Sequence, residues 1–555
     1  MHVDRRLFIG GAVVAAGLAA GAEARPVSTG GGKAHAKAMK ALAAYADLHR
    51  AEWGIPGMTV AVVTRDGFEG VISSGLADVD KRIPVNPDHL FQIGSISKMF
   101  TALAAYSLIG EGKLSAETAL EDALKGVSVR GGKAITLQHL LNHTSGLPAD
   151  STIFPEGGLW VGFAPGEGWS YSNSGYDLAG KIASAADGRS YGEMIKARVL
   201  DKIGMSNSVA GMRVADRRRY AQGYEPALTD RLNPRPGDMT PTPWVDSDSP
   251  AGCIASTAGD MAKFLRFLLA LAEGKGAPVL SDEIAKTFLA DPAEGWGPGA
   301  HYGNGVARIE VDGRKYLHHT GGMISFCSAL HVDSEAGVAA FASANIHYSL
   351  NYRPVRISTF ACELMRAVRE GRDLPQPKPP SIALEKPEQY CGVFASAAGD
   401  AFEVAEAGGK LLLRRNGRES QMQQAAGALF ATTDPDFAVT GVVVEAENDK
   451  AVRAWIGDVE YLVDPSIGFK PSAPEDMRAL AGRYDNDDRW AGPLYVYARD
   501  GGVWIGNAEP LTRIGADEWR LGDETSPERV KFGGFINGKA NLLLFSGTPY
   551  VRRFG

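Results

Sequence analysis

The last third of this 555-residue chain repeats itself, and the repeat constrains the fold more than any other feature. "QYCGVF" at 389 matches "ALAGRY" at 479, "FEVAEAGGKLLL" matches "LYVYARDGGVWI", and "DVEYLV" matches "GTPYVR". These matches align Gly392 with Gly482, Gly409 with Gly502 and Tyr461 with Tyr550. Each copy alternates short β-rich runs with Gly and Asp turns, which is typical of antiparallel sheets. The repeat predicts two tandem all-β barrels or sandwiches, over 388–468 and 474–555.

The chain before the repeat reads as an α+β domain over 34–370. A helix is predicted at 34–52, followed by two strands that an Asp66-Gly67 turn joins. Apolar periodicity predicts further helices, which follow Ser95 and lie around 136–142, 175–187, 190–203 and 258–273. From 302 we expect three or four strands and then a closing helix in "YRPVRISTFACELMRAVRE". Strands at both ends of this stretch are expected to meet in one sheet, and the proline-rich stretch 371–387 reads as a stiff linker.

The N-terminal residues 1–24, "MHVDRRLFIGGAVVAAGLAAGAEA", have the pattern of an export signal. Arg5 and Arg6 stand side by side before a weakly apolar run that is too short to span a membrane. An Ala22-Glu23-Ala24 cleavage pattern follows. Paired arginines favour the twin-arginine route, so we expect a bacterial protein that is periplasmic or secreted, without integral membrane association.

Composition removes several other classes of function. The net charge is −7 and no basic block is present, which argues against a nucleic-acid partner. The four cysteines have no CxxC spacing, and their pairing is left open. There is neither an HExxH motif nor a GxSxG elbow. We therefore expect no metal and no cofactor.

The first segment with candidate catalytic residues is "FQIGSISKMF", where Ser95 and Lys98 lie three residues apart at the start of an apolar run. Residues at this spacing share a helix face, so the ammonium is expected beside the hydroxyl. A buried lysine loses its charge more readily and can then take the serine proton. The alternative is an exposed lysine on an amphipathic helix, because the motif is short.

Two later motifs supply partners for Ser95. "SYSNSG" contains Tyr171 and Asn173, whose side chains project to the same side of an extended segment. "LHHTGG" contains His319, Thr320, Gly321 and Gly322 between strand-like runs, where glycines allow close approach of a backbone or ligand. Taken singly, the first motif is more typical of a buried tyrosine with a capping asparagine than of a catalytic site, and the second is compatible with a simple turn between two strands.

Together, Ser-x-x-Lys, Tyr-x-Asn and His-Thr-Gly resemble the serine β-lactamase and penicillin-recognising peptidase superfamily. The branch they resemble holds class C β-lactamases, DD-carboxypeptidases, D-aminopeptidases and related esterases. "LLNHTSGLP" at 140–148 and "AGCIASTAGDMAKF" at 251–264 are also similar to that branch. The resemblance covers roughly 40–370 and implies a β-lactamase/transpeptidase-like catalytic domain, in which helices flank an antiparallel sheet.

The resemblance also implies roles for the residues. Ser95 would be the nucleophile, and Lys98 and Tyr171 would share the general-base work. Asn173 would orient the substrate, as would the His319-Thr320-Gly321 strand. The backbone N–H groups of Ser95 and Gly322 would form the oxyanion hole.

His319 departs from the Lys-Thr-Gly of class C β-lactamases and matches the DD-peptidase and D-aminopeptidase side of the branch. A fixed ammonium suits a substrate carboxylate, whereas histidine is neutral or partly charged near neutral pH. This argues against a dedicated β-lactamase. Two barrels after the catalytic domain are the architecture of D-aminopeptidases, in which a loop of the last barrel restricts the cleft. "KFGGFINGKAN" and "YDNDDRWAGP" are candidate loops here.

The resulting prediction is an exported serine hydrolase that cleaves peptide or amide bonds of short peptides through a Ser95 acyl-enzyme. Its substrates would contain D- or otherwise non-standard residues. An esterase of the same family is one alternative. A penicillin-binding or peptidoglycan-sensing protein with slow turnover is another. Contact of the barrels with the cell wall, or a homodimer, is left open.

Overall fold

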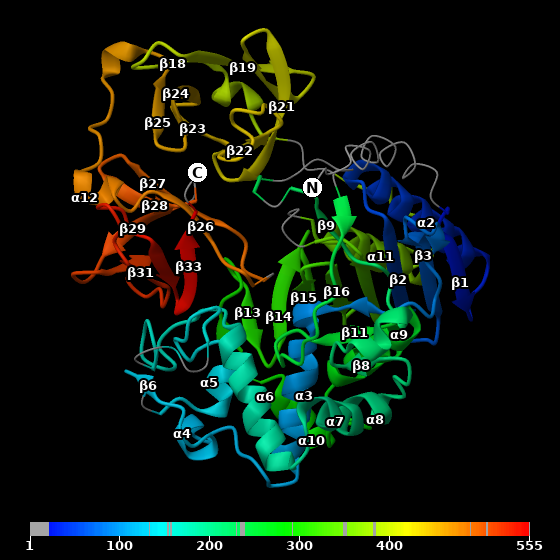
Figure 1. Ribbon diagram of the computed structural model, residues 1–555. Helices are drawn as coiled ribbons and strands as arrows, with labels where there is room; N and C mark the ends of the chain where they lie inside the picture. The colour runs from blue at the N-terminus through cyan, green and yellow to red at the C-terminus, as the bar shows by residue number, and fades with distance from the viewer. Residues whose placement is uncertain are drawn as a thin grey trace, which may run out of the picture. The chain divides into compact units, whose positions relative to one another are not determined.

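Figure 1 shows the computed structural model, in which the chain divides into two compact units. The structure describes residues 22–553 except 133, 153–154, 156–157, 229, 233–238, 291, 348–351, 381–383, 489 and 507–508. The first unit comprises the chain up to Pro226 together with Pro236–Pro380. The second, which we call the barrel unit, comprises Ala227–Arg235 and Ser381–Gly555. The short segment in the middle of the first unit therefore belongs with the barrels, which the sequence did not predict.

The first unit is built on one antiparallel sheet, which confirms the predicted α+β class. In the order of pairing, its strands are β1 (Arg25–Thr29), β3 (Glu69–Asp78), β2 (Gly57–Thr64), β17 (Val338–Ala344), β16 (Cys327–Asp333), β15 (Arg314–Gly322), β14 (Val306–Val311), β13 (His301–Gly303) and β12 (Ala293–Glu294). A short strand, β4 (Ile83–Pro84), pairs with β3. As predicted, strands from the two ends of the unit meet, because β2 lies beside β17.

Apolar side chains on both faces of this sheet are buried by helices (Figure 1). Alternate residues of β17 divide between the faces: Ala340 packs with α2 (Lys33–Trp53) and α11 (Val355–Arg369). Phe341 packs on the opposite side, in the same core as α9 (Ala258–Leu271). A strand with both faces covered needs a continuous apolar run, which "GMTVAVVT" of β2 supplies.

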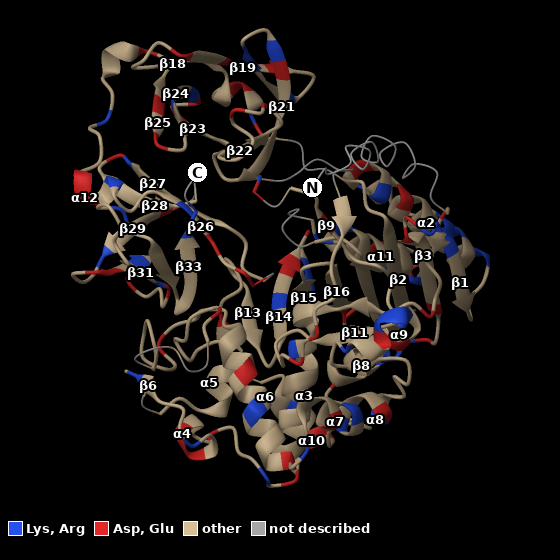
Figure 2. Ribbon diagram, viewed as in Figure 1, with Lys and Arg blue, Asp and Glu red and all other residues tan. Residues whose placement is uncertain are grey.

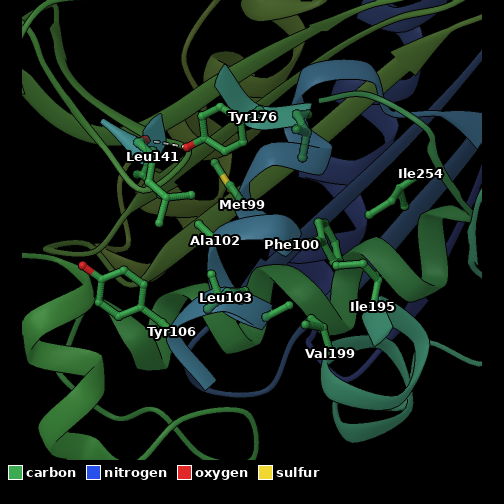
Figure 3. Packing of buried hydrophobic residues seen from close by; sticks show 14 of the residues in the cluster. Met99, Phe100, Ala102, Leu103, Tyr106, Leu141, Tyr176, Ile195, Val199 and Ile254 are labelled. Atoms are coloured by element: carbon green, nitrogen blue, oxygen red, sulfur yellow. Dashed lines mark hydrogen bonds between the residues drawn. The ribbon is translucent and has the colours of Figure 1, made fainter. Parts of the chain in front are cut away.

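A helical region packs on the α9 side of the sheet. It contains α3 (Ser97–Gly110), α4 (Leu120–Ala123), α5 (Leu137–Leu141), α6 (Asn173–Asp187), α7 (Tyr191–Ile195), α8 (Asp201–Ile203) and α10 (Asp282–Phe288). A small sheet of β5 (Phe91–Gln92), β11 (Ile254–Ser256) and β8 (Val209–Ala210) leads into α3. In Figure 3, Met99, Phe100 and Leu103 of α3 lie among side chains of neighbouring helices.

The barrel unit contains two closed antiparallel barrels, which confirms the predicted two all-β domains. The first consists of β18 (Gly392–Ser396), β19 (Ala401–Ala407), β20 (Lys410–Arg415), β21 (Arg418–Ala426), β22 (Leu429–Thr432), β23 (Val442–Glu447), β24 (Lys450–Ile456) and β25 (Val459–Leu462). The second consists of β26 (Gly482–Asp485), β27 (Leu494–Arg499), β28 (Gly502–Ile505), β29 (Glu509–Arg513), β30 (Glu518–Leu521), β31 (Arg529–Gly533), β32 (Leu542–Phe545) and β33 (Thr548–Arg552). Tyr461 and Tyr550, which the repeat aligns, are both buried in barrel cores.

Several sequence expectations need adjustment. From 301 onward there are five described strands, β13 to β17, where three or four were expected, because an Asn304-Gly305 turn with positive φ separates two of them. The helices α4 and α10 were not predicted. Most of the predicted export signal lies outside the described residues. Arg25, the first residue after the predicted cleavage site, is also the first residue of β1.

The four cysteines are free: Cys253, Cys327 and Cys362 are buried in the first unit, and Cys391 is half-buried in the barrel unit. Figure 2 shows that positively and negatively charged residues are interspersed along the chain in both units. Within the described part of the chain, no helix combines the length and apolarity needed to cross a membrane.

Candidate active site

Ser95 lies in a tight turn, Gly94–Ile96, between β5 and α3. It is the one partly exposed residue in the buried stretch 91–100. Gly94 has a φ of 54°, and a Cβ atom there would lie 2.7 Å from the backbone nitrogen of Gly322. A Cβ atom on Gly321 would lie 2.0 Å from the carbonyl oxygen of Ile93. Glycine at both positions therefore lets the end of β15 pack directly against the turn that carries Ser95.

The first turn of α3 presents Lys98 next to Ser95, while the rest of the helix is locked into the core (Figure 3). Lys98 is fully buried, with an exposed fraction of 0%. Its Nζ atom lies 3.1 Å from Ser95 Oγ, 2.6 Å from Asn173 Oδ1 and 2.9 Å from the carbonyl oxygen of Ala251. The lysine is therefore part of a polar cluster, and the exposed-lysine alternative is wrong.

Burial lowers the pKa of Lys98 to about 7, although the charges of Asp177 and Asp150 partly oppose this effect. A neutral amine has two N–H groups and one lone pair. The oxygens of Asn173 and Ala251 can only accept, so they take both N–H groups. The lone pair of neutral Lys98 is then left facing the Ser95 hydroxyl.

Tyr171 and Asn173 stand at the start of α6. Tyr171 hydrogen-bonds to Ser95, and Lys98 Nζ lies 4.8 Å from the centre of its ring. Burial raises the pKa of Tyr171, so the phenol stays protonated at neutral pH. Asn173 joins Lys98 to an exposed carboxylate, because its Nδ2 atom donates to Asp150 Oδ1 over 2.9 Å.

The loop that carries Ala251 is fixed by a carboxylate of α6. Asp177 Oδ1 accepts hydrogen bonds from Ser249 Oγ at 2.7 Å and from the backbone nitrogen of Ala251 at 3.2 Å. Burial raises the pKa of Asp177, and the charge of Lys98 opposes this. Asp177 therefore positions one of the two oxygens that orient Lys98. Short motifs could not reveal it, because Ala251 is brought there only by the tertiary fold.

His319 is buried on β15 and is held as one tautomer. Its Nδ1 atom lies 2.6 Å from the carbonyl oxygen of Thr320, which can only accept, so Nδ1 carries the proton. Nε2 then accepts from the hydroxyl of Tyr302 over 3.0 Å. Burial, with the nearby charge of Lys98, lowers the pKa of His319 well below its usual value. His319 is consequently neutral at physiological pH, and Thr320 beside it is half-buried.

Aromatic side chains that sequence reasoning missed surround this cluster. The ring of His143 lies 4.3 Å from that of Tyr171 and 4.7 Å from that of Tyr302. Trp296 lies 4.7 Å from His319 and stacks on Tyr302 at 5.5 Å. His143, two residues after the end of α5, accepts a hydrogen bond from the backbone nitrogen of Ser172, which ties the Tyr-x-Asn segment to this turn. The available signal was "LLNHTSGLP", which contains His143 and carries part of the resemblance.

The fold thus brings the three sequence motifs to one place. Ser95, Lys98, Tyr171 and Asn173 are linked by hydrogen bonds, and the strand His319–Gly322 packs against the turn before α3. The arrangement offers a hydroxyl, a base of near-neutral pKa, a protonated phenol and a neutral histidine. Such a set can support nucleophilic attack on a carbonyl carbon followed by proton delivery to the leaving group.

Comparison with known proteins gives a consistent picture. A family model described as Beta-lactamase matches residues 37–358. Penicillin-binding protein 4 of Amycolatopsis lactamdurans is 29% identical over 318 residues, which are 53% of this chain and 82% of that protein. A D-aminopeptidase of Gluconobacter oxydans is 26% identical over 508 residues, which are 85% of this chain and 90% of that protein.

Two solved structures share the fold at lower identity. An octameric penicillin-binding protein homologue from Pyrococcus abyssi aligns with a TM-score of 0.55 at 22% identity and covers 76% of this chain and 99% of that one. D-amino acid amidase from Ochrobactrum anthropi SV3 aligns with a TM-score of 0.51 at 24% identity and covers 60% of this chain and 100% of that one. At this identity the likeness concerns the fold alone.

Proposed function

The chain belongs to the beta-lactamase family of serine hydrolases, as its motifs indicated, and from that premise we propose that it cleaves amide bonds of short peptides through an acyl-enzyme on Ser95. The substrates proposed are peptides or amino-acid amides with a free amino group, including those with D-residues. The observation that carries this proposal is that Lys98 is fully buried, with its Nζ atom 3.1 Å from Ser95 Oγ.

In the proposed reaction, neutral Lys98 takes the Ser95 proton as the Oγ atom bonds to the substrate carbonyl carbon. The resulting oxyanion is held by the backbone N–H groups of Ser95 and Gly322. The carbon–nitrogen bond then breaks, and Tyr171 gives its proton to the leaving nitrogen and recovers one from the Lys98 ammonium. The raised pKa keeps Tyr171 protonated at neutral pH, so its proton is present when the leaving nitrogen needs it, and the lowered pKa leaves part of Lys98 neutral, so its lone pair is available. Water releases the acyl group by the reverse transfers.

Asp150 supports the choice of substrates with a free amine. Its carboxylate is exposed and is joined to the nucleophile through Asn173 and Lys98. An acceptor-only group at this place attracts a substrate ammonium and repels a carboxylate. Neutral His319 offers no opposing positive charge on the β15 side. Penicillins carry a carboxylate, so we expect them to acylate Ser95 more slowly than amino-acid amides do.

The decisive experiment compares Ser95→Ala with wild type on D- and L-amino-acid amides, acyl-D-Ala-D-Ala, nitrophenyl esters and a chromogenic cephalosporin. Ser95→Ala should lose turnover and covalent labelling by a fluorophosphonate, whereas Ser115→Ala, at an exposed site, should lose neither. Activity in Ser95→Ala above a thousandth of wild type would refute the nucleophile. Turnover of esters with none of any amide would identify an esterase, and labelling without turnover would identify a penicillin-binding protein.

We also propose that the protein is exported, on the strength of Arg5-Arg6 and the Ala22-Glu23-Ala24 pattern. Cleavage after Ala24 would leave Arg25, the start of β1, as the new N-terminus. Mass spectrometry of the protein recovered from a bacterial periplasm tests this directly. A first residue other than Arg25, or retention of the whole protein in the cytoplasm with Arg5-Arg6 intact, would contradict it.

A further inference from the structure

A cavity in the first unit, about 400 Å³ in volume, has the features of a ligand site. Its walls come from the end of β3, from β5, and from the segments 217–223, 242–245 and 324–326. None of the side chains that line it belongs to the candidate active site. A volume of this size accommodates a small organic ligand, for which roughly 300–1,000 Å³ is typical.

Three buried polar atoms in its wall have no partner within the described part of the chain. They are Gln92 Oε1, Tyr220 OH and Thr242 Oγ1, on side chains whose exposed fractions are 5%, 7% and 5%. Buried polar atoms are normally hydrogen-bonded, because leaving one unpaired destabilises the folded protein. The residues Gln92, Tyr220 and Thr242 all contribute to the wall of this one cavity.

The charge of the wall is positive. Lys81, Arg217 and Arg218 face a single carboxylate, Asp78, which is already paired with Lys81 at 2.6 Å. Arg217 and Arg218 are exposed, and neither forms an ion pair with another described residue. His89 also lines the cavity, and its Nδ1 atom accepts from the backbone nitrogen of Asn86, so neutral His89 carries its proton on Nε2. The ammonium of Lys81, the guanidinium groups of the two arginines and the N–H group of His89 can all donate hydrogen bonds to an anion.

One side of the cavity is lined by apolar and aromatic side chains. Trp244 packs edge-on against Tyr220 with ring centres 4.9 Å apart, and Met212 and Phe326 complete this wall. A ligand that bears only an inorganic anion would leave this wall in contact with water. A ligand with an anionic group at one end and an apolar body at the other can contact both the positively charged wall and the apolar wall of the cavity.

We propose that this cavity binds a carboxylate-bearing ligand with an apolar body, the chemical class of N-acyl amino acids and short peptides. The carboxylate would lie toward Arg217 and Arg218, and the hydroxyls of Tyr220 and Thr242 would complete its polar contacts. The apolar body would lie against Trp244. None of the residues that line the cavity belongs to the candidate active site, and the proposal does not depend on the reaction proposed at Ser95.

Binding of N-acetylphenylalanine to the full chain, measured by calorimetry and ligand-observed NMR, tests the proposal. N-acetylphenylalanine amide, of nearly the same shape without the charge, is the matched ligand. We expect the acid to bind at least about tenfold tighter than the amide, and the double variant Arg217→Ala/Arg218→Ala to weaken acid binding at least about tenfold. Arg213→Ala, which removes an exposed arginine of the same segment that does not line the cavity, should change nothing.

Two further measurements distinguish binding in this cavity from binding at Ser95 and from a purely structural role of the hydroxyls. Labelling Ser95 with a fluorophosphonate should leave acid binding intact. Tyr220→Phe and Thr242→Val should weaken binding while raising the melting temperature of the free protein, because each removes an unpaired hydroxyl. Equal affinity for the acid and the amide, or loss of acid binding after Ser95 is labelled, would overturn the proposal. So would an effect of Arg213→Ala as large as that of the double variant. A lowered melting temperature in both Tyr220→Phe and Thr242→Val would overturn it as well.

Discussion

The Nζ atom of Lys98, a fully buried residue, lies 3.1 Å from the Oγ atom of Ser95, the one partly exposed residue between Phe91 and Phe100. Burial lowers the pKa of Lys98 to about 7. The proposed base is therefore half neutral near pH 7 and carries a proton below it. Because the lone pair is needed, activity should rise with pH.

We expect kcat/KM to fall about tenfold per pH unit below a single pKa near 7 and to be level just above it. His319 should add no second ionisation in this range, because its pKa is well below 6.5. A pH–rate profile from 5 to 9 with an uncharged ester substrate measures this. An acid limb centred near 4, or none, would show that Lys98 is not the base.

Asp150→Asn should weaken binding of substrates with a free amino group but not of N-acetylated substrates. The amide can still accept the hydrogen bond from Asn173 Nδ2, while the negative charge is lost. For substrates with a free amino group we expect KM to rise about tenfold, and for N-acetylated substrates to stay within twofold. The acid limb should also move to lower pH, since the Asp150 charge raises the pKa of Lys98. Equal effects on both substrate classes would contradict ammonium recognition.

Tyr302→Phe should weaken catalysis without unfolding the protein. The variant removes the hydroxyl that donates to His319 Nε2, so the imidazole keeps its Nδ1–H bond but loses its second anchor. The expected loss in kcat/KM is about tenfold, which corresponds to one neutral hydrogen bond. Tyr316→Phe, on the same strand as His319 but without a contact to it, is the control. Unchanged kcat/KM in Tyr302→Phe would separate His319 from the reaction.

The two units should differ in their response to acid. Six histidines of the first unit have strongly lowered pKa values. Burial lowers the pKa to about 4 for His49, His318 and His347. It lowers the pKa well below 6.5 for His143, His319 and His331. Below pH 6.5 the unfolded chain takes protons that the folded unit does not. The free energy of unfolding of the first unit should therefore be highest above pH 6.5, where these histidines are neutral in both states. It should fall as pH drops toward 4, by about 1.4 kcal/mol per pH unit for each histidine.

The barrel unit contains no histidine, so its unfolding should change little between pH 6.5 and 5. Pulse proteolysis after heating, with fragments assigned by mass, follows each unit separately. His49→Gln should reduce the pH slope of the first unit by about one proton, and His301→Gln, at an exposed site, should not. Parallel shifts of both units with pH would contradict this assignment.

Arg499→Ala should destabilise the barrel unit. The guanidinium is 3% exposed, lies 4.8 Å from the ring of Trp504 and 5.4 Å from that of Trp455, and donates to the carbonyl oxygen of Gly457 over 3.1 Å. These contacts join the two barrels. We expect a loss of about 3 kcal/mol in the free energy of unfolding, against less than about 1 kcal/mol for the exposed Arg513→Ala. Similar losses in both variants would show that Arg499 does not join the barrels.

Local sequence patterns predicted much of the fold and part of the candidate active site. Ser95 with Lys98, and Tyr171 with Asn173, are pairs whose spacing within one turn or strand places them together. The contribution of Ala251 to the environment of Lys98, and of Tyr302 to that of His319, depends on distant strands and loops. No local period encodes such contacts. For the same reason, the membership of residues 227–235 in the barrel unit could not be read from the chain.

The pairing of β2 with β17 has a consequence for how the protein is made. Val60 lies opposite Ala342, so the central ladder of the first unit joins residues from its two ends. A nascent chain emerging from the ribosome must hold the apolar β2–β3 hairpin unpaired on that edge until β17 has been synthesised. Each barrel, by contrast, closes from neighbouring hairpins as soon as its last strand emerges. Slow translation before Val338 should therefore increase chaperone dependence of the first unit and leave the barrels unaffected.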